Sequence, residues 1–371
     1  MASLRAIIAD EIRRHGPIPF SRYMELCLYH ADLGYYSRAQ EKFGKAGDFY
    51  TSSDVHAVFG RLLARQFEEM WRALGEPPRL EIIELGPGRG LFARDVIDWS
   101  ARRFPKFHAA MHYLLVERSP GLRQKLFDTL RDAVNHGKAE IAASLPAAPR
   151  ENAIVFANEF FDALPVDVIA HEGLVQVGEE EGKFVESFVP PGDEHFDFLD
   201  RYSVRPQEGE RVEVCRPALE HAAKIAATMK RGFAVLIDYG YTRPEQVAGR
   251  HLDTLMCYRE HQASEDPYQA PGEQDITAHV NFTALEHAAQ DAGMRPLGLV
   301  TQSQFLLGIG EETQFADAFE GCSIPQEHAK VALQLKHLVT PAGMGETFHV
   351  LVLAQGLEAP PPLAGLGFAR K

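Results

Sequence analysis

A short glycine-rich stretch carries the residues of this chain that are best suited to holding a ligand. An apolar run ends in three glycines at alternate positions, Gly86, Gly88 and Gly90, and Leu91 to Ile97 resumes at helical spacing. Glycine lacks a Cβ, so the turn admits positive φ and lets a ligand lie on peptide groups at a helix N-terminus. The pattern predicts a binding turn between a strand and a helix, with a tight turn that holds no ligand as the structural alternative.

The spacing within this turn separates two classes of nucleotide ligand. A dinucleotide site has the pattern G-x-G-x-x-G and holds a pyrophosphate on the helix N-terminus. Here the pattern is G-x-G-x-G, and Glu84 stands two positions before Gly86. A carboxylate at that position repels a pyrophosphate but suits a ligand with cationic groups. S-adenosylmethionine carries a sulfonium and an α-ammonium, so the motif favours this cofactor.

A second carboxylate closes the next predicted strand. The run from Met111 to Val116 is apolar and ends at Glu117, and Ser119 with Pro120 then marks a helix start. In doubly wound sheets the acidic residue after the second strand accepts hydrogen bonds from ribose hydroxyls. We therefore expect Glu117 to bind the ribose of the cofactor, although a lone acid at a strand end is often simply solvated.

A third group of polar residues comes at the end of the predicted strand 152–158. Strand carboxyl ends form the ligand crevice of open α/β sheets, so side chains here are expected to face the ligand. An Asn-x-x-aromatic arrangement resembles the (Asn/Asp)-Pro-Pro-(Tyr/Phe) motif of methyltransferases that act on planar nitrogen. The alternative is that the polar residues cap the following turn and that the aromatic residues belong to the core. The residues concerned are Asn158, Glu159, Phe160, Phe161 and Asp162.

Methyl transfer to a guanidinium needs carboxylates. The guanidinium pKa lies above about 12, so the group is protonated. Acidic side chains must therefore orient its planar set of N–H donors and localise electron density on one nitrogen. Glu159, Asp162 and Asp238 are the candidates, because Asp238 ends another apolar strand, 233–238. We expect these three and Asn158 to be catalytic, with Asn158 also near the cofactor, and Phe160 and Phe161 to contact the substrate.

Composition limits the class of protein and its partners. The chain has 371 residues, 45% of them hydrophobic, and a formal net charge of −14. The length favours more than one structural unit, and the acidic balance argues against nucleic acid and for basic substrates. The 4 cysteines are far apart and the 16 histidines show no ligand spacing, so we expect no metal and no disulfide framework. No apolar run is long enough to span a membrane, and the N-terminus shows no secretory or transit signal.

Periodicity predicts an α/β fold, a Rossmann-like and mostly parallel sheet with a helical N-terminal region and an inserted β-meander and helical lobe. A polar, irregular segment 249–280 suggests a functional loop, with Asp275 and His279 as weaker substrate-binding candidates. The stretch 34–51, with Asp48, combines glycines and aromatics as a loop over the cofactor would, or as a surface loop. The expected pieces are the N-terminal segment 1–53, the sheet core 54–164 and 211–241 with 294–354, the β-meander 165–210, the substrate-side insertion 242–293, and a flexible tail 355–371.

Together these motifs make the chain resemble the MidA family, the S-adenosylmethionine-dependent arginine methyltransferases counted among respiratory complex I assembly factors. The resemblance covers roughly residues 4–354. It departs at Ser52-Ser53-Asp54-Val55, where Ser-Pro-Glu-Ile is expected, and at Met256 and Cys257. The matching blocks are Gly16-Pro17-Ile18-Pro19-Phe20 with Tyr23-Met24, His30 with Leu33-Gly34-Tyr35-Tyr36, Gly47-Asp48-Phe49-Tyr50-Thr51, Glu84 to Gly90, Asn158 to Pro165, Ile237-Asp238-Tyr239-Gly240-Tyr241, Asp266-Pro267, Pro271-Gly272, Asp275 to Phe282 and Met344-Gly345-Glu346.

The resemblance implies a class I methyltransferase sheet, S-adenosylmethionine as methyl donor, and a protein substrate with a target arginine, in mitochondrial members a complex I subunit. It implies Asp48 as a further cofactor-binding residue. We expect a bacterial cytoplasmic protein, whereas eukaryotic relatives act in the mitochondrial matrix, and a homodimer is compatible with the sequence. Two alternatives stay open: a methyltransferase with a small-molecule acceptor, and a non-catalytic complex I assembly chaperone on a methyltransferase fold. A dehydrogenase is disfavoured by the glycine spacing and Glu84.

Overall fold

The computed structural model describes residues 3–37, 57–259 and 262–369, and these fall into two compact units. One, which we call the insert unit, draws on Met1–Phe49, Phe160–Ala222 and Gly240–Ala288. The other, the sheet unit, draws on Tyr50–Glu159, Ala223–Tyr239 and Ala289–Lys371. The insert unit is therefore assembled from three segments that are far apart in the sequence, and the chain passes between the units several times.

The sheet unit contains a mainly parallel sheet with the strand order β15-β16-β10-β5-β2-β3-β4. Strands β2, β3, β4, β5 and β10 run parallel, whereas β16 is antiparallel to both of its neighbours. This confirms the parallel α/β sheet predicted from the sequence. The strands are β2 Leu80–Leu85, β3 Met111–Val116, β4 Ala139–Ala142, β5 Ala153–Asn158, β10 Gly232–Tyr241, β15 Arg295–Thr301 and β16 Phe348–Gln355.

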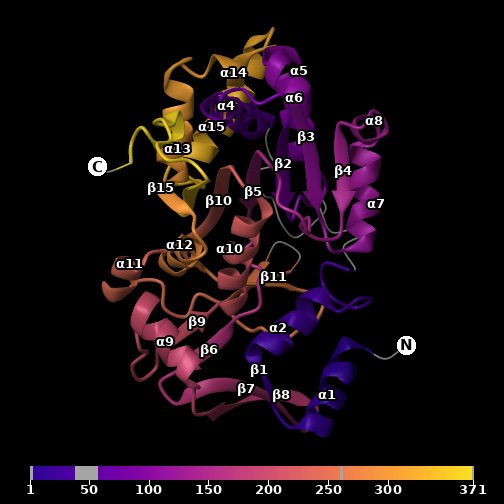
Figure 1. Cartoon of the computed structure of the whole chain (residues 1–371). Helices are drawn as coiled ribbons and strands as arrows, with labels where there is room; N and C mark the ends of the chain where they lie inside the picture. The colour runs from indigo at the N-terminus through magenta and orange to yellow at the C-terminus, as the bar shows by residue number, and fades with distance from the viewer. Residues whose placement is uncertain (1–2, 38–56, 260–261, 370–371) are drawn as a thin grey trace. The chain divides into compact units, whose positions relative to one another are not determined.

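Helices connect these strands, and Figure 1 shows α7 and α8 beside the edge strand β4. All six residues of β2 are buried, as expected for a parallel strand with both faces covered. Of the helices named here, α10 and α12 continue across a unit boundary. The helices are α4 Ala57–Ala73, α5 Leu91–Arg103, α6 Pro105–Ala110, α7 Pro120–Thr129, α8 Arg131–Asn135, α10 Arg216–Thr228, α12 Phe282–Asp291, α13 Gln302–Glu311, α14 Ala316–Phe319 and α15 Pro325–Val339.

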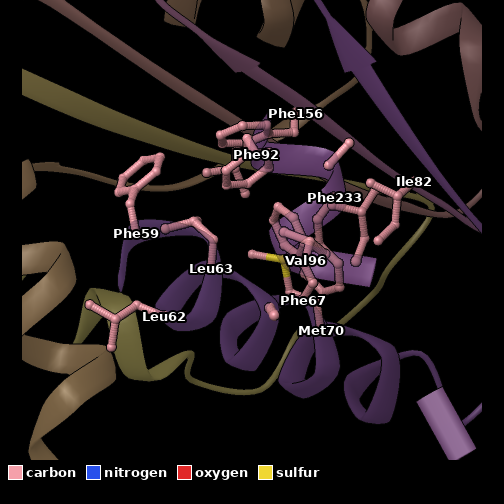
Figure 2. Close-up of a cluster of buried hydrophobic side chains, with 14 of the residues drawn as sticks. Phe59, Leu62, Leu63, Phe67, Met70, Ile82, Phe92, Val96, Phe156 and Phe233 are labelled. Carbon is pink, nitrogen blue, oxygen red and sulfur yellow. The ribbon is translucent and has the colours of Figure 1, made fainter. Parts of the chain in front are cut away.

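The core of the sheet unit is an aromatic cluster between α4, α5 and the sheet, drawn in Figure 2. Phe92 on α5 stacks on Phe156 of β5 with ring centroids 4.4 Å apart. Phe67 of α4 meets Phe156 edge-on at 5.6 Å. These packed rings fix α5 against β5, and α5 begins directly after the glycine turn.

The insert unit holds two small antiparallel sheets. In the first, β7 pairs with β1, β6 and β8, and β9 pairs with β6, so β6, β7 and β8 form the β-meander predicted from the sequence. The second has the order β12-β11-β13, and β14 pairs with the end of β10. The elements are α1 Leu4–His15, β1 Ile18–Pro19, α2 Phe20–Tyr29, β6 Asp167–Ala170, β7 Gly173–Glu180, β8 Lys183–Val189, α9 Asp193–Tyr202, β9 Arg211–Val214, α11 Arg243–Val247, β11 Met256–Arg259, β12 Gln262–Ser264, β13 Asp275–Thr277 and β14 Val280–Asn281.

Two segments of the insert unit contain strands that the sequence analysis does not predict. Glu213 lies in strand β9, and helix α10 begins after it at Arg216. Its buried carboxylate accepts hydrogen bonds from the Thr254 amide at 2.9 Å and the Thr254 hydroxyl at 2.8 Å. The segment 249–280, expected to be irregular, contains the three short strands β11, β12 and β13. The strands β11, β12 and β13 pair with one another, so pairing within the segment 249–280 gives this segment its structure.

The C-terminal tail is not flexible throughout, so the prediction for 355–371 is wrong for its central part. Residues Ala364–Leu366 form a 3₁₀ turn, η1, and the yellow C-terminal segment in Figure 1 lies against α13. The Gly365 amide donates to the Gln66 Oε1 atom at 2.8 Å, and the Leu363 side chain is buried in the core of the sheet unit. The tail is thus a part of the sheet unit.

Replacing Leu363 with alanine is expected to lower the free energy of unfolding by about 2–4 kcal/mol, the usual loss for a buried leucine. Leu363 is 3% exposed, whereas Leu333 on α15 is 68% exposed and supplies the matched control. Leu333→Ala should change stability by less than about 0.5 kcal/mol. Urea denaturation followed by circular dichroism measures both variants, and equal losses would contradict the packed tail.

Within the described residues, no helix combines the length and apolarity that a bilayer span requires.

Candidate functional site

The site in the sheet unit lies where the strand order reverses. From β2 the chain moves outward to β3 and β4, and it then returns to β5 on the other side of β2. In open α/β sheets, ligands bind beyond the carboxyl ends of the strands at such a reversal. The residues at the ends of β2, β3 and β5 are therefore the first candidates.

The glycine turn comes directly after β2 and uses backbone conformations that favour glycine. Gly86, Gly88 and Gly90 have φ values of 61°, 54° and 76°. The Gly86 amide donates to the Val116 carbonyl at 3.1 Å, which ties the turn to the end of β3. A Cβ on Gly88 would meet no atom of the described residues within 4 Å, so these residues leave the space in front of the middle glycine open. The turn can therefore accept a ligand directly on its backbone.

Glu84, one residue before the end of β2, is buried at 5% exposure. Its Oε2 atom accepts a hydrogen bond from the Tyr113 hydroxyl at 2.7 Å. Burial raises the pKa of Glu84 to about 8, and the hydrogen bond from Tyr113 opposes this rise. Glu84 therefore lies beside the glycine turn as a desolvated carboxyl group.

Glu117 comes directly after β3, and its carboxylate is held by the start of the next helix. Its Oε1 atom accepts a hydrogen bond from the Ser119 amide at 2.7 Å, and its backbone carbonyl accepts one from Arg123 Nη1 at 3.0 Å. Burial raises the pKa of Glu117, while the hydrogen bond from the Ser119 amide lowers it. The position at the end of β3 is the one that the sequence predicts for a ribose-binding acid.

Asn158 is the last residue of β5, on the other side of the strand-order reversal, and Glu159 follows it directly. The Asn158 Nδ2 atom donates to the Glu159 Oε1 atom at 3.0 Å, and the Glu159 amide donates to the Ile237 carbonyl at 3.0 Å. Glu159 has a φ of 51°, which a residue with a Cβ rarely adopts. Strain of this kind is concentrated at functional sites, where the surrounding structure maintains it. Glu159 is thus a geometric outlier at the expected ligand crevice.

Asp238 is buried at 1% exposure within β10, which continues to Tyr241. The sequence predicts Asp238 at the end of its strand, and the longer β10 corrects this. The Asp238 Oδ1 atom accepts a hydrogen bond from the Tyr239 amide at 3.0 Å. Asp238 pairs in register with His349 on β16.

The predicted substrate residues Phe160 and Phe161, and the predicted catalytic acid Asp162, belong to the insert unit. Phe160 and Phe161 meet edge-on with ring centroids 5.2 Å apart, and Phe160 also meets the His221 ring at 5.1 Å. Asp162 is buried at 6% exposure, and its backbone carbonyl accepts a hydrogen bond from the Ala278 amide at 3.0 Å. This bond joins the segment after β5 to the segment after β13.

Asp275 lies in a cluster of tyrosines within the insert unit. The Tyr36 hydroxyl lies 3.0 Å and 3.1 Å from the two carboxylate oxygens of Asp275, and the Tyr36 ring stacks on Tyr29 at 5.5 Å. Burial raises the pKa of Tyr36, with Asp275, Tyr29 and Asp162 adding to the rise. Burial likewise raises the pKa of Tyr258, and Asp162 and Asp275 add to it. Asp162 and Asp275, both predicted as site residues, thus raise the pKa of the same two tyrosines, Tyr36 and Tyr258.

His279 occupies a different environment in the same unit. Its Nδ1 atom lies 3.1 Å from Nδ1 of His251, and its amide donates to the Thr254 hydroxyl at 3.0 Å. Its side chain lines a small pocket together with apolar residues such as Phe161 and Val280. Its role in substrate binding stays a prediction.

The predicted residues thus separate by unit. Glu84, the turn glycines, Glu117, Asn158 and Glu159 lie at the ends of adjacent strands of the sheet unit, with Asp238 nearby in β10. Phe160, Phe161, Asp162, Asp275 and His279 lie in the insert unit, and Asp48 is outside the described residues. In the part of the chain that the structure describes, no group of histidine, cysteine and acidic side chains could hold a metal ion.

Two tyrosines are not among the residues that the sequence predicts for the site. Tyr113 binds Glu84, and Tyr36 binds Asp275. Tyr113 could have been found by aligning the two strands at their common carboxyl edge, which places it two positions below Glu84. For Tyr36 no comparable local signal exists, because Asp275 lies more than 200 residues away in the sequence.

Comparison with known proteins adds independent findings. Residues 62–300 match the family model Methyltransf_28, described as an S-adenosyl-L-methionine-dependent methyltransferase. The chain is 30% identical to the mitochondrial protein arginine methyltransferase NDUFAF7 of Danio rerio, over 92% of this chain and 84% of that protein. It is 29% identical to the mitochondrial NDUFAF7 homolog of Drosophila melanogaster, over 96% of this chain and 86% of that protein.

A solved structure extends the similarity to the whole chain. It is that of a COG1565 superfamily member from Burkholderia thailandensis bound to S-adenosyl-homocysteine. The two chains superpose with a TM-score of 0.83 at 30% sequence identity, covering 99% of this chain and 95% of the other. A native structure of a COG1565 superfamily protein from the same organism superposes with a TM-score of 0.85 at 31% identity.

Proposed function

The chain belongs to this family of S-adenosyl-L-methionine-dependent methyltransferases, and from that premise we propose that it methylates an arginine side chain of a protein. The observation that carries the proposal is the Asn158–Glu159 pair, in which an amide and a carboxylate are joined at 3.0 Å at the end of β5. A guanidinium acceptor needs such a carboxylate, and the two NDUFAF7 relatives compared above are named protein arginine methyltransferases.

The cofactor is S-adenosylmethionine, which supplies a methyl group activated by a positively charged sulfur. The residues of the sheet unit fit it, since the space before Gly88 is open and the nearby Glu84 and Glu117 carboxyl groups suit cationic and hydroxyl groups. In the proposal, the turn from Gly86 to Gly90 carries the cofactor, Glu84 binds its amino-acid part and Glu117 binds its ribose. Asp48 remains a further candidate for this site.

The protein's part in the reaction is alignment and charge control. Methyl transfer is an in-line displacement, so the nucleophilic nitrogen must be held on the line of the breaking bond. A guanidinium is protonated and its electrons are delocalised. In the proposal, Glu159 and Asp238 of the sheet unit accept its N–H groups and favour electron density on one nitrogen, while the Asn158 amide orients Glu159. Asp162 of the insert unit remains a proposed catalytic acid. Phe160, Phe161, Asp275 and His279 are proposed to contact the rest of the substrate.

The acceptor is proposed to be a subunit of respiratory complex I, the NADH:quinone oxidoreductase. This rests on the resemblance to MidA proteins, which are counted among the assembly factors of that complex. The formal net charge of −14 also favours a basic peptide around the target arginine. The eukaryotic relatives compared above are named mitochondrial, which agrees with such a partner.

The test is transfer of a labelled methyl group from S-adenosylmethionine to proteins of cells from which this gene has been deleted. Label should appear as methylarginine in one polypeptide that purifies with NADH:quinone oxidoreductase. Label found only in small molecules would overturn the protein acceptor. Binding of the cofactor with no transfer to any fraction would instead favour an assembly chaperone. Methylarginine in an unrelated protein would overturn the complex I assignment alone.

Replacing Glu117 with alanine is expected to raise the dissociation constant for S-adenosyl-homocysteine by roughly one to two decades, because charge-assisted hydrogen bonds to a hydroxyl pair are lost. Glu140, exposed on the neighbouring strand β4, provides the control, and Glu140→Ala should bind normally. Isothermal titration calorimetry measures both. An unchanged affinity in Glu117→Ala would remove Glu117 from the cofactor site.

A further inference from the structure

The Glu84 side chain lies on the apolar face of β2. Side chains alternate along a strand, so Leu80, Ile82 and Glu84 share one face. Leu80 and Ile82 belong to the aromatic core cluster of the sheet unit, and Glu84 continues their row toward the glycine turn. A carboxyl group therefore ends a row of core residues at the edge where the cofactor is expected.

Tyr113 reaches this carboxyl group from the neighbouring strand. In the parallel pairing of β2 and β3, Tyr113 is in register with Ile82, and Leu115 is in register with Glu84. Two strand positions span about 6.6 Å, close to the length of a tyrosine side chain. The fully buried Tyr113 ring thus runs along the sheet and brings its hydroxyl to 2.7 Å from Glu84 Oε2.

No cation balances Glu84 among the residues that the structure describes. The groups that set its pKa are burial, which raises the pKa to about 8, and the Tyr113 hydroxyl, which lowers it. Its register partners on the two adjacent strands, Leu115 and Phe156, are apolar. A buried carboxylate with one neutral hydrogen bond is poorly stabilised. It needs either a proton or a cation supplied from outside the protein.

We propose that Tyr113 positions the Glu84 carboxyl group, and that Glu84 exchanges its proton for the α-ammonium of the cofactor's amino-acid part. The proton passes to solvent, and the ammonium takes its place as the compensating positive charge. No covalent bond changes. This inference rests on the S-adenosylmethionine cofactor alone and not on the identity of the methyl acceptor, so either can fail without the other.

The experiment is calorimetric titration of the full-length protein with S-adenosyl-homocysteine, which carries the same α-ammonium and does not react. Titrations in buffers of different ionisation enthalpy give the number of protons released per ligand bound. Near pH 7 the wild type should release close to one proton, and the number should fall toward zero by about pH 9.5. Below pH 7 the affinity should increase about tenfold for each unit by which the pH is raised.

Two variants separate Glu84 from other sources of protons. Glu84→Gln cannot exchange a proton, so it should show only the protons that the ligand itself exchanges, together with weaker binding. Glu81→Gln is the matched control, because Glu81 is also a buried glutamate on β2 but is paired with His112 and Arg150. Glu81→Gln should keep the proton release of the wild type.

Tyr113→Phe tests the positioning role. Without the hydroxyl the Glu84 carboxylate is less stable, so the dissociation constant at pH 7 should rise about tenfold. The dissociation constants of Tyr113→Phe and wild type should become more similar as the pH rises to 9.5, because Glu84 then loses its proton even without the ligand. A purely structural tyrosine would weaken binding equally at every pH. Tyr23→Phe, which removes another buried hydroxyl with a hydrogen bond of 2.8 Å, should leave proton release unchanged.

The proposal is wrong if wild type and Glu84→Gln release the same number of protons at pH 7 while both bind the ligand. It is also wrong for Tyr113 if Tyr113→Phe lowers the affinity by the same factor at pH 7 and pH 9.5. Circular dichroism on each variant establishes that it is folded before its titration is interpreted.

Discussion

Valine in place of Gly88 raises the dissociation constant for S-adenosyl-homocysteine at least about 100-fold while the protein stays folded. A Cβ at Gly88 would meet no atom of the described residues within 4 Å, so this part of the protein does not obstruct the start of a side chain there. The same side chain would project into the space where the cofactor must lie on the turn. Isothermal titration calorimetry measures the loss.

Backbone strain is the competing explanation for a loss of binding in Gly88→Val, and a second glycine of the chain provides a control for it. Gly88 has a φ of 54°, which is unfavourable for valine by roughly 1–2 kcal/mol. Gly137, between α8 and β4, has a φ of 67°, and an added Cβ there would also meet no atom within 4 Å among the residues that the structure describes. Gly137→Val should therefore show a similar decrease in melting temperature and normal binding. If Gly137→Val loses binding as well, strain and not occlusion explains the Gly88 result.

The sheet core could be predicted because its signals are local. A parallel strand is buried on both faces, so β2, β3 and β5 read as short apolar runs that end in polar or glycine residues. Their carboxyl ends meet at one edge of the sheet. Glu84, Glu117 and Asn158 could thus be placed near one another from the sequence, although their roles toward the cofactor remain predictions.

The insert unit could be predicted only in part, because distant contacts determine it. Strand β13 is fully buried, yet the surrounding segment is polar and shows no alternating pattern. Asp162 comes three positions after Glu159, and the sequence therefore suggests one continuous group of site residues. The structure assigns Glu159 to the sheet unit and Asp162 to the insert unit. Sequence proximity alone could not reveal that division.

The C-terminal tail could not be predicted either, because its packing also depends on distant parts of the chain. Three consecutive prolines, 360–362, favour an extended chain, and no local pattern indicates a buried turn immediately after them. Leu363 is buried in the core of the sheet unit, and the turn that follows it lies against α13. The Gln66 side chain then supplies the hydrogen bond acceptor for the Gly365 amide. Such packing depends on the assembled fold.

Replacing Glu159 with glutamine lowers kcat by about 10²–10³-fold and leaves the affinity for S-adenosyl-homocysteine within about threefold of wild type. Glutamine keeps the shape of the side chain and removes its charge. The loss of one preorganised charged group from a transition-state interaction has an effect of this size. A carboxylate that acts on the acceptor, and not on the cofactor, should change kcat and cofactor binding in this unequal way. Methyl transfer to the acceptor and calorimetry measure the two quantities.

The strained backbone at Glu159 permits a sharper version of this test. Glu76, in the loop before β2, has a φ of 53°, is exposed and belongs to the same unit, so Glu76→Gln controls for the glutamate and its conformation. Glycine at position 159 removes the carboxylate and also relieves the unfavourable φ of 51°. Glu159→Gly should therefore unfold at a temperature no lower than wild type and still lose activity. If Glu159 is retained only for structure, Glu159→Gly should keep its activity and unfold at a lower temperature than wild type. That result would remove Glu159 from the acceptor site.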